Sequence, residues 1–273
     1  MSAVGLLLTR IAAAVLVVSA PVLAIAAELP LHRRRRLALI AAVLFSTMSQ
    51  GCAGSHNAAA SEQRVARDAH DGHDAHYPAH WWAPVSPEGA PSWEILPQAA
   101  FPGEVILSKR HELGLLSNFA PTPFQYRGKR YASLEGFWQT MKYPEGPDDP
   151  RARHADVVWP HTRDEVAQLT AFEAKAAGSA AEANMKRMGI TWVTFEGERL
   201  EYRTAERGRH YALIVSATRE KVRQNPDVES VLLSTGDLIL RPDHHQEPNP
   251  PPAWRYYDIL TEIRTELQRQ PAK

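Results

Sequence analysis

Hydrophobic and polar positions alternate regularly only from about Phe101 onward. Phe124 and Tyr126 fall on one face of an extended segment and Gly128 follows at a turn, so the pattern predicts a hairpin over residues 123–133. Ser133 then offers a hydroxyl to the free amides at the start of a helix. We therefore expect a helix to begin directly after Ser133.

Further helices and strands are predicted along the rest of this region. Apolar residues recur at helical spacing over 149–158, 163–188, 206–224, 227–233 and 254–268, and short strands are expected at 104–107 and 238–240. The sequence has no internal repeat, no GxGxxG motif, no P-loop and no GxSxG motif. The predicted fold class is α+β, with a single, mainly helical domain and a small sheet over residues 101–270.

Composition narrows the function classes. The chain has 273 residues, enough for one substantial core, and its 31 Lys and Arg residues equal its 31 Asp and Glu residues. A balanced charge gives no general attraction to nucleic acid or to an anionic membrane. The single cysteine, Cys52, cannot form an internal disulfide.

The first 52 residues have the composition of a targeting region. Residues 1–31 are an apolar segment, either membrane-associated or upstream of the true start. Residues 32–52 resemble a bacterial lipoprotein signal, because four arginines precede a short apolar run and a small residue precedes Cys52, the expected lipidation site. A double membrane segment is the alternative. The signal predicts a lipid anchor in the cell envelope, facing the periplasm or the exterior; if it is misinterpreted, the protein is cytoplasmic.

Residues 53–100 are rich in Ala, His, Asp and Pro and are predicted to be a tether between the anchor and the domain. Imidazole and carboxylate groups recur in this tract at spacings that could hold a metal ion, but Gly72 and Pro78 disfavour a helix. No metal site is therefore assigned, and the weak candidates are His70, His73, His76 and His80.

Candidate chemistry concentrates in RYASLEGFWQTMKY, residues 130–143. On a helix, Glu135, Gln139 and Lys142 share one flank beside an apolar stripe. Desolvation by the apolar stripe would raise the carboxyl pKa of Glu135, whereas Lys142 would lower it and could bind an anion. A solvated glutamate that interacts with the helix dipole is the alternative.

Two loops add further candidates. Asn118 could contact a ribose or a base edge, Phe119 could stack on a ring, and Asp243 follows a buried strand as a possible second carboxylate. Each also has an ordinary structural interpretation, namely an Asx turn, core packing and a turn after proline.

Taken together, these motifs resemble the NADAR family, the YbiA-like N-glycosidases. The resemblance rests on Ser117-Asn118-Phe119, a hairpin, SLEGFWQTMKY, VLLSTGDLIL and a closing helix, and it covers about residues 104–268. It implies a YbiA-like architecture and a hydrolase that cleaves a ribosyl N-glycosidic bond. The implied substrate is nucleotide-like, either an ADP-ribosylated nucleic acid base or a ribosylaminopyrimidine phosphate of the riboflavin pathway.

The resemblance also implies roles for single residues. Glu135 and Asp243 would be the carboxylates at the ribose, and Lys142 with Arg130 would pair with phosphate oxygens. The other implied substrate-binding residues are Asn118, Phe119, Gln139 and Trp192. No cofactor and no protein partner are expected.

Two departures from the family pattern concern the substrate. The chain has Gly136 where the family has a histidine, and His244-His245 and a proline-rich stretch follow Asp243 in place of an aromatic, glycine-rich loop. The alternative function is an envelope lipoprotein that binds a nucleotide-like ligand or a metal without catalysis.

Overall fold

The computed structural model describes residues 76–270. The two N-terminal predictions, for residues 1–31 and 32–52, lie outside the described residues, as do Cys52, His70 and His73. Within the described part, no helix is both long enough and apolar enough to cross a bilayer.

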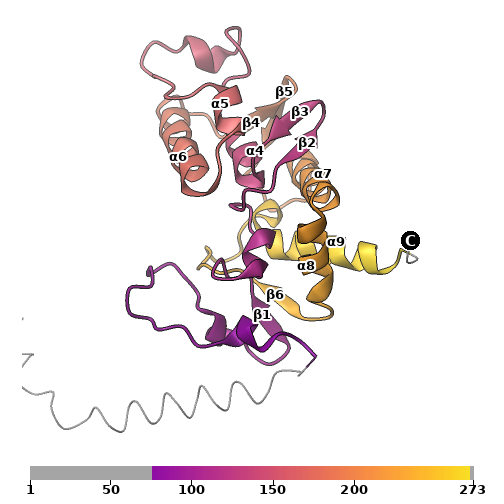
Figure 1. Ribbon diagram of the computed structural model, residues 1–273. Coiled ribbons are helices and arrows are strands. Elements are labelled where there is room, and N and C mark those ends of the chain that lie inside the picture. The colour runs from indigo at the N-terminus through magenta and orange to yellow at the C-terminus, as the bar shows by residue number, and fades with distance from the viewer. Residues whose placement is uncertain (1–75, 271–273) are drawn as a thin grey trace, which may run out of the picture. The chain divides into compact units, whose positions relative to one another are not determined.

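The described residues form an α+β fold in which helices predominate (Figure 1). The α-helices are α4 (Leu134–Thr140), α5 (Arg163–Ala167), α6 (Ala171–Arg187), α7 (Arg209–Gln224), α8 (Pro226–Ser234) and α9 (Tyr256–Gln268). The strands are β1 (Glu104–Ile106), β2 (Phe124–Tyr126), β3 (Lys129–Tyr131), β4 (Trp192–Phe195), β5 (Glu198–Glu201) and β6 (Ile239–Arg241). Short 3-10 turns connect several of these elements. The α+β class is therefore confirmed.

The strands form three two-stranded sheets within the described region, rather than the one small sheet that was expected. β1 and β6 pair in parallel, with Val105 opposite Leu240, and join two segments that lie far apart in the sequence. β2–β3 and β4–β5 are antiparallel hairpins. Only the first hairpin was predicted from the sequence.

Both hairpins turn through the same backbone conformation. Arg127 and Gly128 have φ angles of 48° and 77°, and Glu196 and Gly197 have φ angles of 51° and 79°. Two consecutive residues with positive φ match the right-handed twist of the strands they join, and glycine adopts this conformation without strain. The Glu196-Gly197 pair is thus the sequence signal of the hairpin that was missed.

The helix predicted over 163–188 is divided into α5 and α6. Tertiary hydrogen bonds hold the break open: Ser133 Oγ donates to the carbonyl of Leu169 at 2.9 Å, and the amide of Ala171 donates to the carbonyl of Phe119 at 3.2 Å. Helical periodicity does not record such contacts, so the sequence pattern alone suggested one long helix.

The helix predicted over 149–158 is reduced to a 3-10 turn, Pro150–Arg153. Its buried arginine explains the difference. The guanidinium of Arg151 bonds Asp149 and the carbonyls of Met141 and Lys142, so this segment is held by tertiary hydrogen bonds rather than by a helical ladder.

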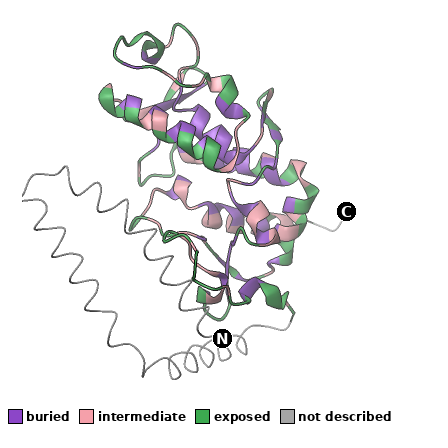
Figure 2. Cartoon of the chain, turned by 60° about the vertical axis from the view of Figure 1, so that its left-hand side comes forward, coloured by how far each residue is buried: buried purple, intermediate pink, exposed green. Residues whose placement is uncertain are grey.

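The segment before Phe101 is part of the fold from residue 76 onward. Trp81 and Trp82 are buried in the core, and the indole of Trp82 donates to the carbonyl of Glu104 at 2.8 Å. The domain boundary predicted near Phe101 is thus too late, because aromatic burial in this stretch was not anticipated. Figure 2 shows buried residues running through the inner helices and strands, with exposed residues on outer helix faces and loops.

Candidate active site

A cavity of about 560 Å³ opens beside α4. Its walls come from α4, the loop before β2, α6, the residues after β5, the loop after β6 and the start of α9. Five residues singled out from the sequence line it: Asn118, Phe119, Glu135, Gln139 and Lys142. The structure therefore brings together most of the residues predicted for substrate contact.

Glu135 is 7% exposed and lies at the start of α4, where Ser133 caps the helix by accepting a hydrogen bond from the amide of Gly136 at 2.9 Å. Its backbone amide donates to the carbonyl of Asn118 at 2.8 Å, which joins the helix to the Asn118 loop. Burial raises the carboxyl pKa of Glu135, and a hydrogen bond from Gln139 and the charges of Lys175, Lys142 and His244 only partly offset this effect. The carboxylate therefore holds a proton more readily than an exposed glutamate does.

Gln139 fixes the orientation of that carboxylate. Its Nε2 donates to Oε1 of Glu135 at 2.7 Å, and its buried Oε1 has no hydrogen-bond partner within the described residues. A Cβ added at Gly178 of α6 would overlap this amide, so the glycine makes the room that Gln139 occupies. The unpaired oxygen therefore packs against α6, while the amide nitrogen holds the carboxylate of Glu135.

Gly136 faces away from the cavity, toward the break between α5 and α6. A Cβ at this position would lie 2.6 Å from the carbonyl oxygen of Leu169. An imidazole at position 136 would therefore collide with backbone, and α4 packs closely here because the residue is glycine.

Cationic groups line one side of the cavity. Lys142 Nζ lies 3.1 Å from Oε2 of Glu182, and Arg203 pairs with the same carboxylate. Burial lowers the pKa of Lys142, although Glu182 opposes the shift. Lys175 is exposed and makes no ion pair with any described residue. This side of the cavity is suited to the oxygens of a phosphate group.

Aromatic rings line the mouth of the cavity. Phe172 is 61% exposed and Trp93 is 40% exposed, and the ring centroids of Phe119 and Phe172 are 5.3 Å apart. Lys109 Nζ lies 5.3 Å from the centroid of Phe119. Trp93 and Phe172 were missed from the sequence, since one lay in the presumed tether and the other in the presumed long helix.

Asp243 is only 2% exposed and is absent from the cavity wall, although three of its partners line it. It accepts hydrogen bonds from Lys109, from Nδ1 of His244 at 3.0 Å and from the hydroxyl of Tyr256 at 3.4 Å. Burial alone would raise the carboxyl pKa of Asp243, but the hydrogen bonds from His244 and Lys109 outweigh it and leave the pKa lowered. The carboxylate reaches the cavity only through these partners.

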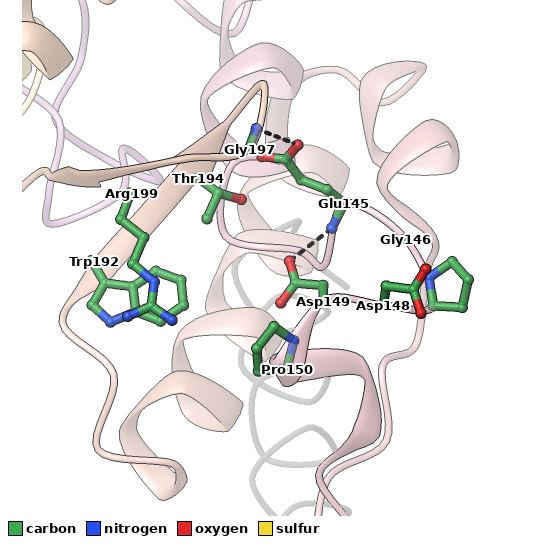
Figure 3. A pocket seen from close by; sticks show the side chains of 10 residues that line it. Glu145, Gly146, Asp148, Asp149, Pro150, Trp192, Thr194, Gly197 and Arg199 are labelled. Carbon is green, nitrogen blue, oxygen red and sulfur yellow. Dashed lines mark hydrogen bonds between the residues drawn. The ribbon is translucent and has the colours of Figure 1, made fainter.

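Trp192 lies in a second cavity of about 420 Å³, shown in Figure 3. Its ring stacks under the guanidinium of Arg199, at 4.3 Å from the centroid. Glu145 lies across this cavity. Its carboxylate accepts a hydrogen bond from the amide of Gly197 at 2.9 Å, and its backbone amide donates one to the carboxylate of Asp149 at 3.0 Å. The structure does not bring Trp192 to the cavity that holds Glu135.

The remaining candidates lie elsewhere. The guanidinium of Arg130 is exposed and contacts Gln168, and Nε2 of His80 lies 2.7 Å from Oε1 of Glu112. Over residues 76–270, which include His76 and His80, no group of three or more His, Cys, Asp or Glu side chains is arranged to hold a metal ion.

Neither the family models nor the curated proteins contain a match to this chain. Among solved structures, the NMR structure of the E. coli protein YbiA is similar, with 19% sequence identity and a TM-score of 0.38. The alignment covers 60% of this chain and 86% of that chain. A likeness at this level does not establish the family of the chain.

Proposed function

We propose that the protein hydrolyses the bond between ribose C1′ and a nitrogen in a nucleotide-like substrate, within the cavity beside α4. The observation that carries the proposal is the buried carboxylate of Glu135, whose pKa is raised and which faces a cavity bordered by cations and aromatic rings. Both proposed substrate classes, an ADP-ribosylated base and a ribosylaminopyrimidine phosphate, contain a ribosyl C–N bond together with phosphate.

The chemistry requires a negative group near the sugar. Cleavage of a ribosyl C–N bond develops positive charge at C1′ and on the ring oxygen, and a desolvated carboxylate stabilises this charge or accepts a proton from the attacking water. Glu135 is suited to either role because Gln139 holds its orientation at 2.7 Å. Its raised pKa favours proton acceptance.

Different walls of the cavity would contact different parts of the expected substrate. Lys142, Lys175 and Arg203 would contact phosphate oxygens, because their side chains line one side. Phe119 and Phe172 would stack on the base. A volume of about 560 Å³ falls in the range typical of small-molecule sites, which supports a ligand of nucleotide size.

The test is base release by the full-length protein. ADP-ribosylated oligonucleotide, NAD and a ribosylaminopyrimidine phosphate are incubated separately, and the products are separated by chromatography. We expect release of free base from at least one of them. Glu135→Gln, which keeps the shape and removes the charge, should lower turnover by roughly 10²- to 10⁴-fold.

The matched control is Glu173→Gln, the same substitution at an exposed glutamate of α6 outside the cavity wall. This variant should retain the turnover of the wild type. Near-normal turnover by Glu135→Gln on an accepted substrate would remove Glu135 from the mechanism, and absence of base release from all three substrates would refute the proposed reaction.

A further inference from the structure

We propose that His244 is the acid that protonates the leaving nitrogen, and that Asp243 is the residue that positions it. This inference rests on the proposed function. It assigns a proton donor to the reaction and changes the role expected for Asp243, from a carboxylate at the ribose to a group that acts through its neighbour.

The geometry orients the imidazole toward the cavity. Nδ1 of His244 lies 3.0 Å from Oδ1 of Asp243, and an ionised carboxylate can only accept a hydrogen bond, so Nδ1 carries the proton of that contact. The opposite nitrogen, Nε2, has no hydrogen-bond partner within the described residues. Since His244 lines the cavity and its side chain is 38% exposed, Nε2 is accessible to a bound substrate.

The surroundings of the ring hold it in place. The imidazole lies parallel to the ring of Tyr256, with an interplanar angle of 1° and a centroid separation of 6.2 Å. The hydroxyl of Tyr256 and the ammonium of Lys109 both bond Asp243, so the carboxylate that orients His244 is itself held by two further groups. Such support reduces the reorganisation needed when the proton moves.

Asp243 places a negative charge beside the imidazole. Its hydrogen bonds with His244 and Lys109 lower the pKa of this carboxyl and keep it ionised. The charge of His244 also acts on Glu135 across the cavity, where it lowers the pKa of that carboxyl. The donor and the acceptor of protons therefore face the same space from α4 and from the loop after β6.

His244 and Glu135 together account for the protons that move during hydrolysis. The C1′–N bond breaks, and its electron pair takes the proton from Nε2 of His244 to give the free base. Water adds to C1′, and Glu135 accepts the proton that the water loses. Glu135 then returns its proton to solvent and His244 regains one from solvent, so no other reactant is needed.

The test compares two kinds of leaving group on the full-length chain. A riboside of an amine or amide nitrogen needs a proton as the bond breaks, whereas a pyridinium riboside such as NAD releases a neutral base without one. We expect His244→Gln to lower kcat by roughly 10²- to 10³-fold on the first kind, the usual scale for losing an acid, and by less than about threefold on the second. A purely structural role would lower both equally.

His154→Gln is the matched control, because His154 is exposed and lies outside the cavity wall. It should match the wild type on both substrates, and thermal unfolding should show that His244→Gln remains folded. Three results with an active wild type would overturn the role of His244 and leave the proposed reaction standing. His244→Gln could lose equal activity on both kinds of substrate, it could lose none on either, or the wild type could turn over the pyridinium substrate alone. Absence of base release by the wild type would overturn both.

Discussion

Glu135 at the start of α4 and Asp243 after β6 are both buried acids, yet their carboxyl pKa values move in opposite directions. Asp243 accepts hydrogen bonds from Lys109, His244 and Tyr256, and these contacts stabilise its charge. The carboxylate of Glu135 accepts a side-chain hydrogen bond from the amide of Gln139, and burial has the larger effect on its pKa. Burial alone therefore does not determine what an acid can do; the number and charge of its partners decide it.

The opposite pKa shifts suit the two acids to different chemical roles. An acid with a raised pKa that lines the cavity can exchange protons with substrate or water. An acid with a lowered pKa, closed off behind three side chains, stays ionised and orients its neighbours. Sequence motifs paired these two residues as equal carboxylates at the ribose, whereas their contacts give them different positions relative to the cavity.

The sharpest test of this difference is a double-mutant cycle at Asp243 and His244. If Asp243 acts through His244, Asp243→Asn should lower kcat by roughly 10²-fold on a substrate whose leaving group needs protonation, and should add less than about threefold in a His244→Gln background. Steady-state kinetics of the four proteins measure the coupling. Multiplicative losses would mean that Asp243 acts independently of His244.

A smaller effect is expected at the aromatic mouth of the cavity. Phe172 is 61% exposed, so Phe172→Leu should not affect folding, but it removes a ring that would stack on the base. We expect KM to rise by roughly 5- to 100-fold with little change in kcat, given about 1–3 kcal/mol per stacked base. Phe101→Leu, at another exposed ring outside the cavity wall, is the control. An unchanged KM would exclude Phe172 from binding.

The smallest effect concerns pH. The Lys175 ammonium stabilises the ionised form of Glu135 and so lowers its carboxyl pKa; removing that charge leaves the pKa higher still. A base must be deprotonated, so activity falls as pH drops through this pKa, and Lys175→Met should move the acidic limb of the kcat/KM profile to higher pH. Lys186→Met, at an exposed lysine of the same helix, should leave the limb in place. A limb that stays fixed or moves to lower pH in Lys175→Met would show that Glu135 is not the titrating base.

Local signals predicted much of the fold. Alternation around Gly128 located the β2–β3 hairpin, Ser133 located the start of α4, and helical spacing located α7, α8 and α9. The parallel pairing of β1 with β6 could not be predicted, because it joins residues 135 positions apart, Glu104 and Ile239, through backbone bonds that leave no periodic pattern.

The candidate site was predicted in part. Helical spacing grouped Glu135, Gln139 and Lys142 correctly on one wall of the cavity. The close packing of Gly136 against the carbonyl of Leu169 was not predicted, and His244 was noted as a departure from the family pattern but was not assigned to this cavity. These features depend on which segments meet in space, so they appear only once the chain is folded.

The most direct test of the proposed reaction is hydrolysis in water labelled with heavy oxygen. Wild-type, full-length protein is incubated with each accepted substrate, and both products are analysed by mass spectrometry. If water attacks C1′ while the C–N bond breaks, the heavy oxygen appears on the ribose and the released base carries none. No released base, or label found on the base or on a phosphate, would contradict cleavage of a ribosyl N-glycosidic bond.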